Sequence, residues 1–221
     1  CFGNALHPCL VAPLLSQAAL GSDDPACQAP SKPVGPVYDE DEARRLASER
    51  GWSIARDGER WRRVVPSPEP RRIVELGTIR LLVEAGVLVV CTGGGGIPVV
   101  ESDGALHGVE AVIDKDLAAA LLARDLRADA LLLLTDVPAV EVGWGTPDAR
   151  AISQATPAEL RAAGLAAGSM GPKAEAAARF VEQTGAFAAI AALGDAAAAL
   201  DRRAGTAVVP ESTAAPATEP M

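Results

Sequence analysis

The chain has 221 residues, enough for one sizeable domain or for one domain with a small appendage. It is 49% hydrophobic and 22% charged, as is usual for a globular protein, and its net charge of −9 argues against nucleic acid or an anionic membrane as a partner. No stretch reaches the length of a membrane span, and Cys9–Leu20 lacks the basic start of a signal peptide, so we expect neither feature in this chain.

The first part of the chain has few regular elements. Residues 1–37 are rich in Pro, Ala and Ser and show little periodicity. Asp39–Arg50 predicts an amphipathic helix, with acidic residues in its first turn as the helix dipole favours. Short strands are predicted at Trp52–Ala55 and Trp61–Val65, and Pro66–Pro70 is typical of a stiff, extended linker between subdomains.

After this linker, helices alternate with apolar strands. Val87–Cys91 is a continuous apolar run, which suits a strand covered on both faces. Repeated helix and strand units predict an α/β fold with an open, mainly parallel sheet between two helical layers. The tail Pro210–Met221 has the composition of a disordered segment. The predicted helices are Arg72–Ala85, Ala118–Leu126, Pro172–Gln183 and Asp195–Asp201, and the strands are Val87–Cys91, Ala130–Leu134, Phe187–Ala191 and Thr206–Val209.

A glycine-rich loop follows directly on the strand Val87–Cys91. Four successive glycines let a backbone approach a ligand and turn several N–H groups toward an anion. The loop is neither a Walker A motif nor a dinucleotide fingerprint, and a flexible connection is the alternative. Ligands bind at the carboxyl ends of strands in open α/β sheets, which favours an anion site. The four residues are Gly93, Gly94, Gly95 and Gly96.

Only three of the twenty basic residues are lysines, namely Lys32, Lys115 and Lys173. A coding bias toward Arg would explain the small number of lysines, and each lysine could occupy an ordinary surface position. However, Lys115 and Lys173 fall in the first turn of predicted helices, where the dipole disfavours a cation by roughly 0.3–1 kcal/mol. A bound anion would reverse that preference. Lys32 lies in a proline-clamped segment and could reach over a site from a lid.

Acidic residues adjoin these lysines. Asp114 is placed to cap a helix, while Asp116 could orient Lys115 or hold a magnesium ion. Thr135-Asp136 ends the second buried strand, at the ligand edge, although it is also compatible with a plain turn. Separated lysines, backbone N–H groups and a magnesium ion suit phosphoryl transfer, in which the protein mainly positions reactants and neutralises charge.

Other chemistries find little support in the sequence. His7 and His107 have no partner at metal-ligand spacing, so no direct metal ligand is expected, and no Ser/His/acid arrangement suggests a covalent nucleophile. The four cysteines show neither a CxxC pair nor zinc-like spacing, and we interpret them as free thiols in a reducing compartment. They are Cys1, Cys9, Cys27 and Cys91.

Taken together, several motifs between about Ser22 and Val209 resemble carbamate kinase. This resemblance implies the amino-acid-kinase fold, a three-layer αβα sandwich, and reversible phosphoryl transfer between ATP and carbamate, with carbamoyl phosphate as the partner substrate. It also implies dependence on Mg²⁺, a cytoplasmic homodimer and a role in arginine catabolism. The motifs are Asp23–Tyr38, Val64–Pro70, Gly93–Pro98, Gly108–Asp116, Leu134–Val137 and Gly168–Lys173.

The resemblance also implies roles for individual residues. Lys115, Asp116 and Lys173 would be catalytic, and Lys32, Gly3 and Asn4 would bind substrate. The nucleotide would contact Gly93, Gly94, Gly95, Gly96, Thr135, Asp136 and Met170. The implied organisation is an amino-terminal remnant (1–21), a protruding subdomain or lid (22–65), a nucleotide-binding α/β domain (66–209) and a tail (210–221).

The amino-terminal part departs from the family pattern. Phe2 replaces the first glycine of a Gly-Gly-Asn-Ala-Leu motif, and a His-Gly-Asn-Gly loop is absent together with several strands and helices. We expect this incomplete portion to leave a sheet with an uncovered face and an unpaired edge. The alternatives are a catalytically inactive remnant that at most binds nucleotide or a partner subunit, and a kinase of another small acid, which the subdomain argues against.

Overall fold

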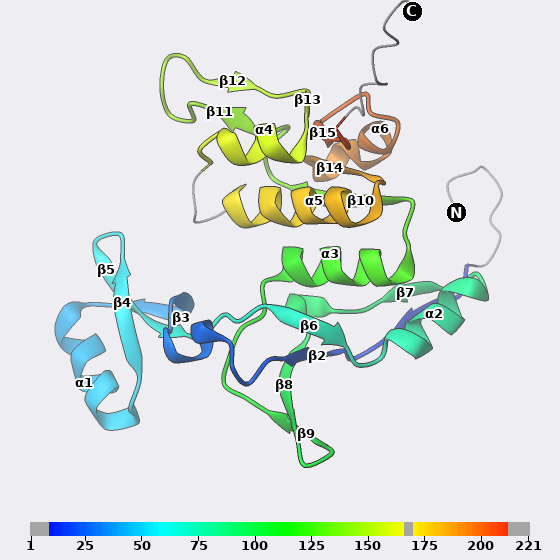
Figure 1. The fold of residues 1–221 in the computed structure, drawn as a ribbon. Coiled ribbons are helices and arrows are strands. Elements are labelled where there is room, and N and C mark those ends of the chain that lie inside the picture. Colours follow the sequence, from blue (N-terminus) through cyan, green and yellow to red (C-terminus); the bar gives the residue numbers. More distant parts are fainter. Residues whose placement is uncertain (1–8, 166–169, 212–221) are drawn as a thin grey trace, which may run out of the picture. The chain divides into compact units, whose positions relative to one another are not determined.

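The computed structural model describes residues 9–165 and 170–211. Gly3 and Asn4, and nearly all of the tail, lie outside the described residues. The chain divides into two compact units, residues 1–121 and 122–221, and helix α3 (Lys115–Leu126) begins in the first and ends in the second. Each unit is described by itself (Figure 1).

The first unit contains two small sheets. One has the order β6–β2–β8–β9, in which β2 is parallel to β8 and the other pairs are antiparallel. In the other, β1 runs parallel to β7, and α2 precedes β7. The bounds are β1 Val11–Pro13, β2 Gln17–Leu20, β6 Pro70–Ile73, α2 Leu76–Glu84, β7 Leu88–Val90, β8 Ile97–Ser102 and β9 Ala105–Gly108, with 3₁₀ turns at Pro25–Gln28 and Gly93–Gly95.

A third sheet of the first unit is antiparallel and forms a subdomain with α1 (Glu40–Arg50), the blue-to-cyan part at the left of Figure 1. Its order is β3–β5–β4, with bounds Lys32–Tyr38, Arg60–Val65 and Ser53–Asp57. Asp39 caps α1 by accepting the Glu42 N–H at 2.8 Å, and the helix ends at Gly51 in the left-handed conformation. Helix α1 buries Ala43 and Leu46.

The second unit is built on a four-stranded sheet of order β10–β14–β15–β13. Strands β10 and β14 are parallel, whereas β15 runs antiparallel to β14. Ala199 of α6 packs with Phe187, Ala189 and Ala191 of β14. Because side chains alternate along a strand, the buried Ala188 and Ile190 face the other side, and α5 packs against the same strand. Helices therefore cover both faces, as the sequence predicts.

The remaining bounds complete the second unit. Two-residue strands form the β11–β12 hairpin, and α4 packs on α5. The elements are β10 Ala130–Thr135, β11 Glu141–Val142, β12 Arg150–Ala151, β13 Gln154–Ala155, α4 Pro157–Ala162, α5 Met170–Thr184, β14 Phe187–Ala192, a 3₁₀ turn Leu193–Asp195, α6 Ala196–Leu200 and β15 Thr206–Val208.

Two sequence-based predictions are wrong. Residues 72–75 are not helical, because Pro70–Ile73 pairs with β2 and Ile73 is buried as part of strand β6. The run Val87–Cys91 is not covered on both faces. Leu88 and Val90 are 50% and 54% exposed, and their register partners on β1 are exposed as well. We call Val11, Pro13, Leu88 and Val90 the β1–β7 apolar face.

Candidate active site

The glycine loop is held at both ends by one residue, Ser16, which the sequence did not single out. Ser16 is 4% exposed; its Oγ accepts the Thr92 N–H at 3.0 Å, and its backbone oxygen accepts the Ile97 N–H at 2.8 Å. Thr92, Gly94, Gly95 and Gly96 have φ values of 51°, 65°, 95° and 91°. The loop is thus a fixed turn, and the signal that could have indicated this is a serine inside the apolar stretch after Cys9.

Gly95 brings the loop against the chain segment that precedes α3. A Cβ atom placed on Gly95 would lie 2.5 Å from the backbone oxygen of Ile113, which is far closer than real Cβ contacts. Only glycine permits this approach, and it also tolerates the positive φ. The loop therefore lies beside the residues that start α3.

Asp114 joins the start of α3 to the subdomain. Its Oδ1 accepts the backbone N–H of Asp116 at 2.9 Å and that of Leu117 at 3.3 Å, which confirms the predicted helix cap. Its Oδ2 lies 3.1 Å from Nζ of Lys32 on β3. Burial raises the pKa of Asp114, but the hydrogen bonds from Lys32 and the backbone outweigh it, so the pKa is lower than usual and the group is charged at neutral pH.

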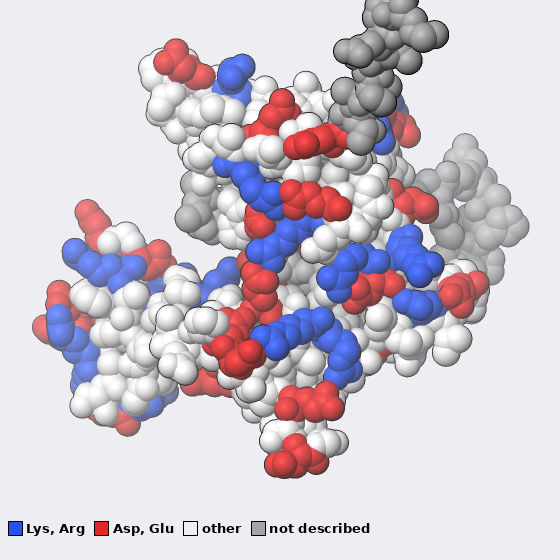
Figure 2. Space-filling model, viewed as in Figure 1, with Lys and Arg blue, Asp and Glu red and all other residues white. Residues whose placement is uncertain are grey.

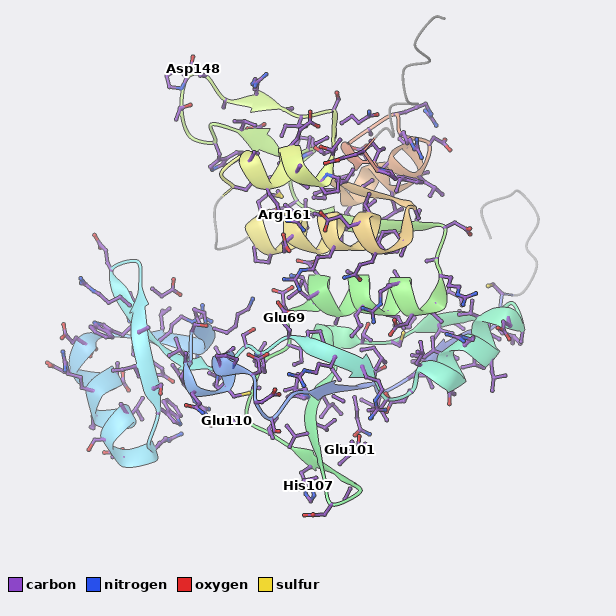
Figure 3. All side chains as sticks on the ribbon, viewed as in Figure 1. Glu69, Glu101, His107, Glu110, Asp148 and Arg161 are labelled. Atoms are coloured by element: carbon purple, nitrogen blue, oxygen red, sulfur yellow. The ribbon has the colours of Figure 1, made fainter. Side chains whose placement is uncertain are left out.

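Two further contacts link the same segment to the subdomain and its linker. Arg63 of β5 pairs with Glu110, which is labelled in Figure 3, and the Val112 N–H donates to the Pro66 oxygen at 2.9 Å. Together with Asp114, these contacts fall on alternate residues of the segment. The segment 110–114 is therefore fixed at three points, two on the subdomain and one on its linker.

Lys115 and Asp116 occupy the first two positions of α3. Nζ of Lys115 lies 3.6 Å from Oδ2 of Asp116. The lysine side chain is 70% exposed, whereas the aspartate side chain is 8% exposed. The first unit thus brings Lys32, Lys115, Asp116 and the glycine loop around the Asp114 cap, with both lysines open to an anionic ligand.

The second unit places the other predicted residues along one edge of its sheet. Thr135 ends β10, and its hydroxyl donates to Oδ1 of Asp136 at 3.1 Å. Helix α5 leads into β14, which is parallel to β10, so the amino terminus of α5 lies at the carboxyl edge of both strands. Met170 is the first residue of α5, and Lys173, in its first turn, is 6% exposed.

The other sequence expectations concern metals, thiols and membranes. Within residues 9–165 and 170–211, no three His, Cys, Asp or Glu side chains are grouped so as to hold a metal ion. Cys9, Cys27 and Cys91 are free thiols, as predicted, and burial raises the pKa of Cys91. In that part of the chain no helix combines the length and hydropathy of a membrane span.

Comparison with known proteins identifies the family. The model of the amino acid kinase family matches residues 15–191, and the chain belongs to this family. More specifically, it is similar to carbamate kinases, as its motifs indicate. It is 50% identical to the carbamate kinase of Haemophilus influenzae over 198 residues, which are 89% of this chain and 64% of that protein. The carbamate kinase of Rhizobium meliloti is 51% identical over 90% of this chain and 62% of its own.

Solved structures agree with this assignment. A structure of carbamate kinase from Giardia lamblia bound to AMP-PNP has a TM-score of 0.84 and 41% identity, covering 93% of this chain and 67% of that one. A crystal structure from Aeropyrum pernix K1 also has a TM-score of 0.84, with 46% identity. The expected amino-acid-kinase fold is thereby confirmed. The chain spans less than two thirds of the length of the two carbamate kinases from Haemophilus influenzae and Rhizobium meliloti.

Proposed function

We propose that the protein is a carbamate-kinase-like phosphotransferase that interconverts carbamoyl phosphate and ADP with carbamate and ATP. In the direction of ATP synthesis, the bond between phosphorus and the carbamate oxygen breaks, and a β-phosphate oxygen of ADP forms the new bond to phosphorus. The observation that carries the proposal is the Lys32–Asp114 pair at the start of α3, beside Lys115, in a chain about half identical to carbamate kinases.

The proposed roles are those that the resemblance to carbamate kinase implies, and the charges and positions of the residues support them. Lys32 and Lys115 neutralise the oxygens of the moving phosphoryl group, and Asp116 orients Lys115. Lys173 binds the nucleotide phosphates, where the start of α5 adds its own attraction for anions. Thr135, Asp136 and Met170 line the nucleotide side, and Gly93–Gly96 provide backbone N–H groups. Gly3 and Asn4 are proposed to bind substrate and lie outside the described residues.

Magnesium fits this site as a companion of the nucleotide. Mg²⁺ usually keeps several waters and binds one or two carboxylates together with substrate phosphates, so a cage made only of protein groups is not required. Asp116, in the first turn of α3, would be such a carboxylate. When bound, the ion would neutralise charge on the phosphates.

The cellular setting is also proposed from the resemblance. We place the protein in the cytoplasm as a homodimer that works in arginine catabolism, with carbamate and carbamoyl phosphate as its small-molecule substrates. Acidic and basic side chains are interspersed over the visible face in Figure 2. Together with a net charge of −9, this mixture gives no support for a nucleic acid partner.

ATP formation tests the proposal directly. Purified protein with ADP, Mg²⁺ and carbamoyl phosphate should form ATP, detected by luciferase luminescence. Lys115→Ala should lower kcat by a factor of about 100 or more, because a charge-stabilising group is lost. Arg203→Ala, which removes an exposed pair with Asp201, is the matched control and should leave the rate unchanged. Folded wild-type protein that forms no ATP would refute the assignment.

A second candidate is a protein that binds nucleotide without turnover. The exposed β1–β7 apolar face favours it, because in a working enzyme a face of this kind is normally covered. Fluorescent mant-ADP separates the two functions. Under the second one, the chain would bind mant-ADP and lose that binding in Lys173→Ala, yet form no ATP.

A further inference from the structure

We infer that Asp114 is a positioning residue that holds the Lys32 ammonium group in place to receive the anionic substrate. The inference rests on the proposed function, because it names a residue that prepares the same site. Asp114 is not itself expected to touch substrate, since both of its carboxylate oxygens already accept hydrogen bonds within the protein.

The two carboxylate oxygens of Asp114 accept hydrogen bonds from different parts of the protein. Oδ1 caps α3 through two backbone N–H groups, and Oδ2 accepts from Nζ of Lys32 at 3.1 Å. The Asp114 side chain is only 11% exposed, so it is a fixed anchor, whereas the Lys32 side chain remains 37% exposed. An ammonium group has three donors, so a lysine held through one of them keeps two for a ligand.

The surroundings reinforce the anchoring. Segment 110–114 is attached at Glu110 to Arg63 and at Val112 to Pro66, so Asp114 ends a stretch whose position relative to β5 is already fixed. Lys32 pairs with Val65 in the register of β3 and β5, which fixes its backbone in turn. A flexible lysine loses rotamer freedom when it binds a ligand, and preorganisation removes much of that cost.

The negative charge of Asp114, considered alone, predicts the opposite effect on substrate binding. A carboxylate beside the site repels an anionic substrate and competes with it for Lys32. If competition dominated, removal of the charge would strengthen binding. Preorganisation predicts that removal weakens it, so the sign of the change decides between the two roles.

Asp114→Asn is the variant to test, because asparagine caps helices as well as aspartate does but cannot pair with an ammonium ion. Asp39→Asn is the matched control: Asp39 caps α1 in the same way, and no ion pair to it is found among the described residues. Because the chain has only three lysines, brief acetylation followed by peptide mass spectrometry reports on Lys32 by itself. Phosphonoacetamide, a stable isostere of carbamoyl phosphate, is the probe ligand.

We expect Lys32 to be acetylated several-fold faster in Asp114→Asn than in wild type, because the variant lacks the ion pair. The concentration of phosphonoacetamide that half-protects Lys32 should rise about three- to tenfold. The KM for carbamoyl phosphate should rise by the same factor, while the KM for ADP stays constant. Asp39→Asn should change none of these, and a general loss of folding would instead alter both KM values and the labelling of Lys173.

Three other outcomes would overturn the inference. Unchanged Lys32 labelling would show that the pair does not form in solution, and tighter protection in Asp114→Asn would establish competition. No protection of wild-type Lys32 would show that no anion is received there. The protection assay needs no turnover. Wild-type protein that makes no ATP but protects Lys32 in an Asp114-dependent way would refute the proposed function and leave this inference standing.

Discussion

Three neighbouring glycines of the loop provide a graded test of how it is built. We expect alanine substitution to be harmless at Gly93, mildly destabilising at Gly94 and severe at Gly95. The three positions differ in only two respects, the sign of φ and the space available to a Cβ atom. Gly93 has neither problem, Gly94 has a φ of 65° but open space, and Gly95 has a φ of 95° with Ile113 in contact.

The magnitudes follow from these two terms. A positive φ costs a residue with a Cβ atom about 1–2 kcal/mol, which is the whole penalty at Gly94. At Gly95 the Cβ would also lie 2.5 Å from backbone, which cannot rotate away, and such overpacking typically adds about 1–3 kcal/mol. The expected loss is therefore about 2–5 kcal/mol for Gly95→Ala. Gly93→Ala should be neutral, or stabilise by about 0.4–1 kcal/mol through the unfolded state.

Urea unfolding of the three variants, followed by circular dichroism, measures these differences against wild type. The order of the midpoints is the diagnostic result, since all three substitutions add one methyl group within three residues. A Gly95→Ala variant no less stable than Gly94→Ala would show that the loop does not pack on Ile113.

Three other outcomes are expected. The lowered pKa of Asp114 means that its pairing stabilises the fold fully above its ordinary pKa of 3.8 and less as pH falls through the lower folded value. The stability advantage of wild type over Asp114→Asn should thus shrink as the pH falls below about 4 in urea titrations, and a constant advantage would refute the Lys32 pair. Arg161, labelled in Figure 3, pairs with two glutamates of α5, and Arg161→Ala should cost about 1 kcal/mol at low salt and less at 1 M NaCl; equal losses at both would contradict an ionic origin. Leu88→Gln, on the β1–β7 apolar face, should change stability by less than about 0.5 kcal/mol and lower self-association in light scattering, whereas a larger loss would mean that the face is buried in solution.

The sequence predicted the parts of the fold that carry strong local signals. Asp39 with its following acids marks α1, and the continuous apolar runs mark β10 and β14. The Asp114 cap was also predictable, because an aspartate before a helical pattern has one dominant structural use. In these cases the residue type and its immediate neighbours determine the structure.

Elements and contacts that depend on residues distant in the sequence were not predicted. Strand β3 carries Pro33 and Pro36, which normally argue against a strand, yet it pairs with β5 through a register shift between Val34 and Val37. Ile73 fits a helical spacing but belongs to β6, since β2 offers it a partner. The Lys32–Asp114 pair joins residues 82 positions apart, and no local pattern encodes that contact.

The three lysines show how these two kinds of information combine. Their scarcity was readable from the sequence, and the positions of two of them in helix first turns suggested an anion. What the structure adds is that one of them, Lys32, is held by the residue that starts the helix of another, Lys115. A single carboxylate therefore connects Lys32 to the helix start that carries Lys115, although the two lysines come from distant parts of the chain. Phosphoryl transfer depends on such fixed spacing more than on the number of charges, because a preorganised cation is not reordered as charge develops.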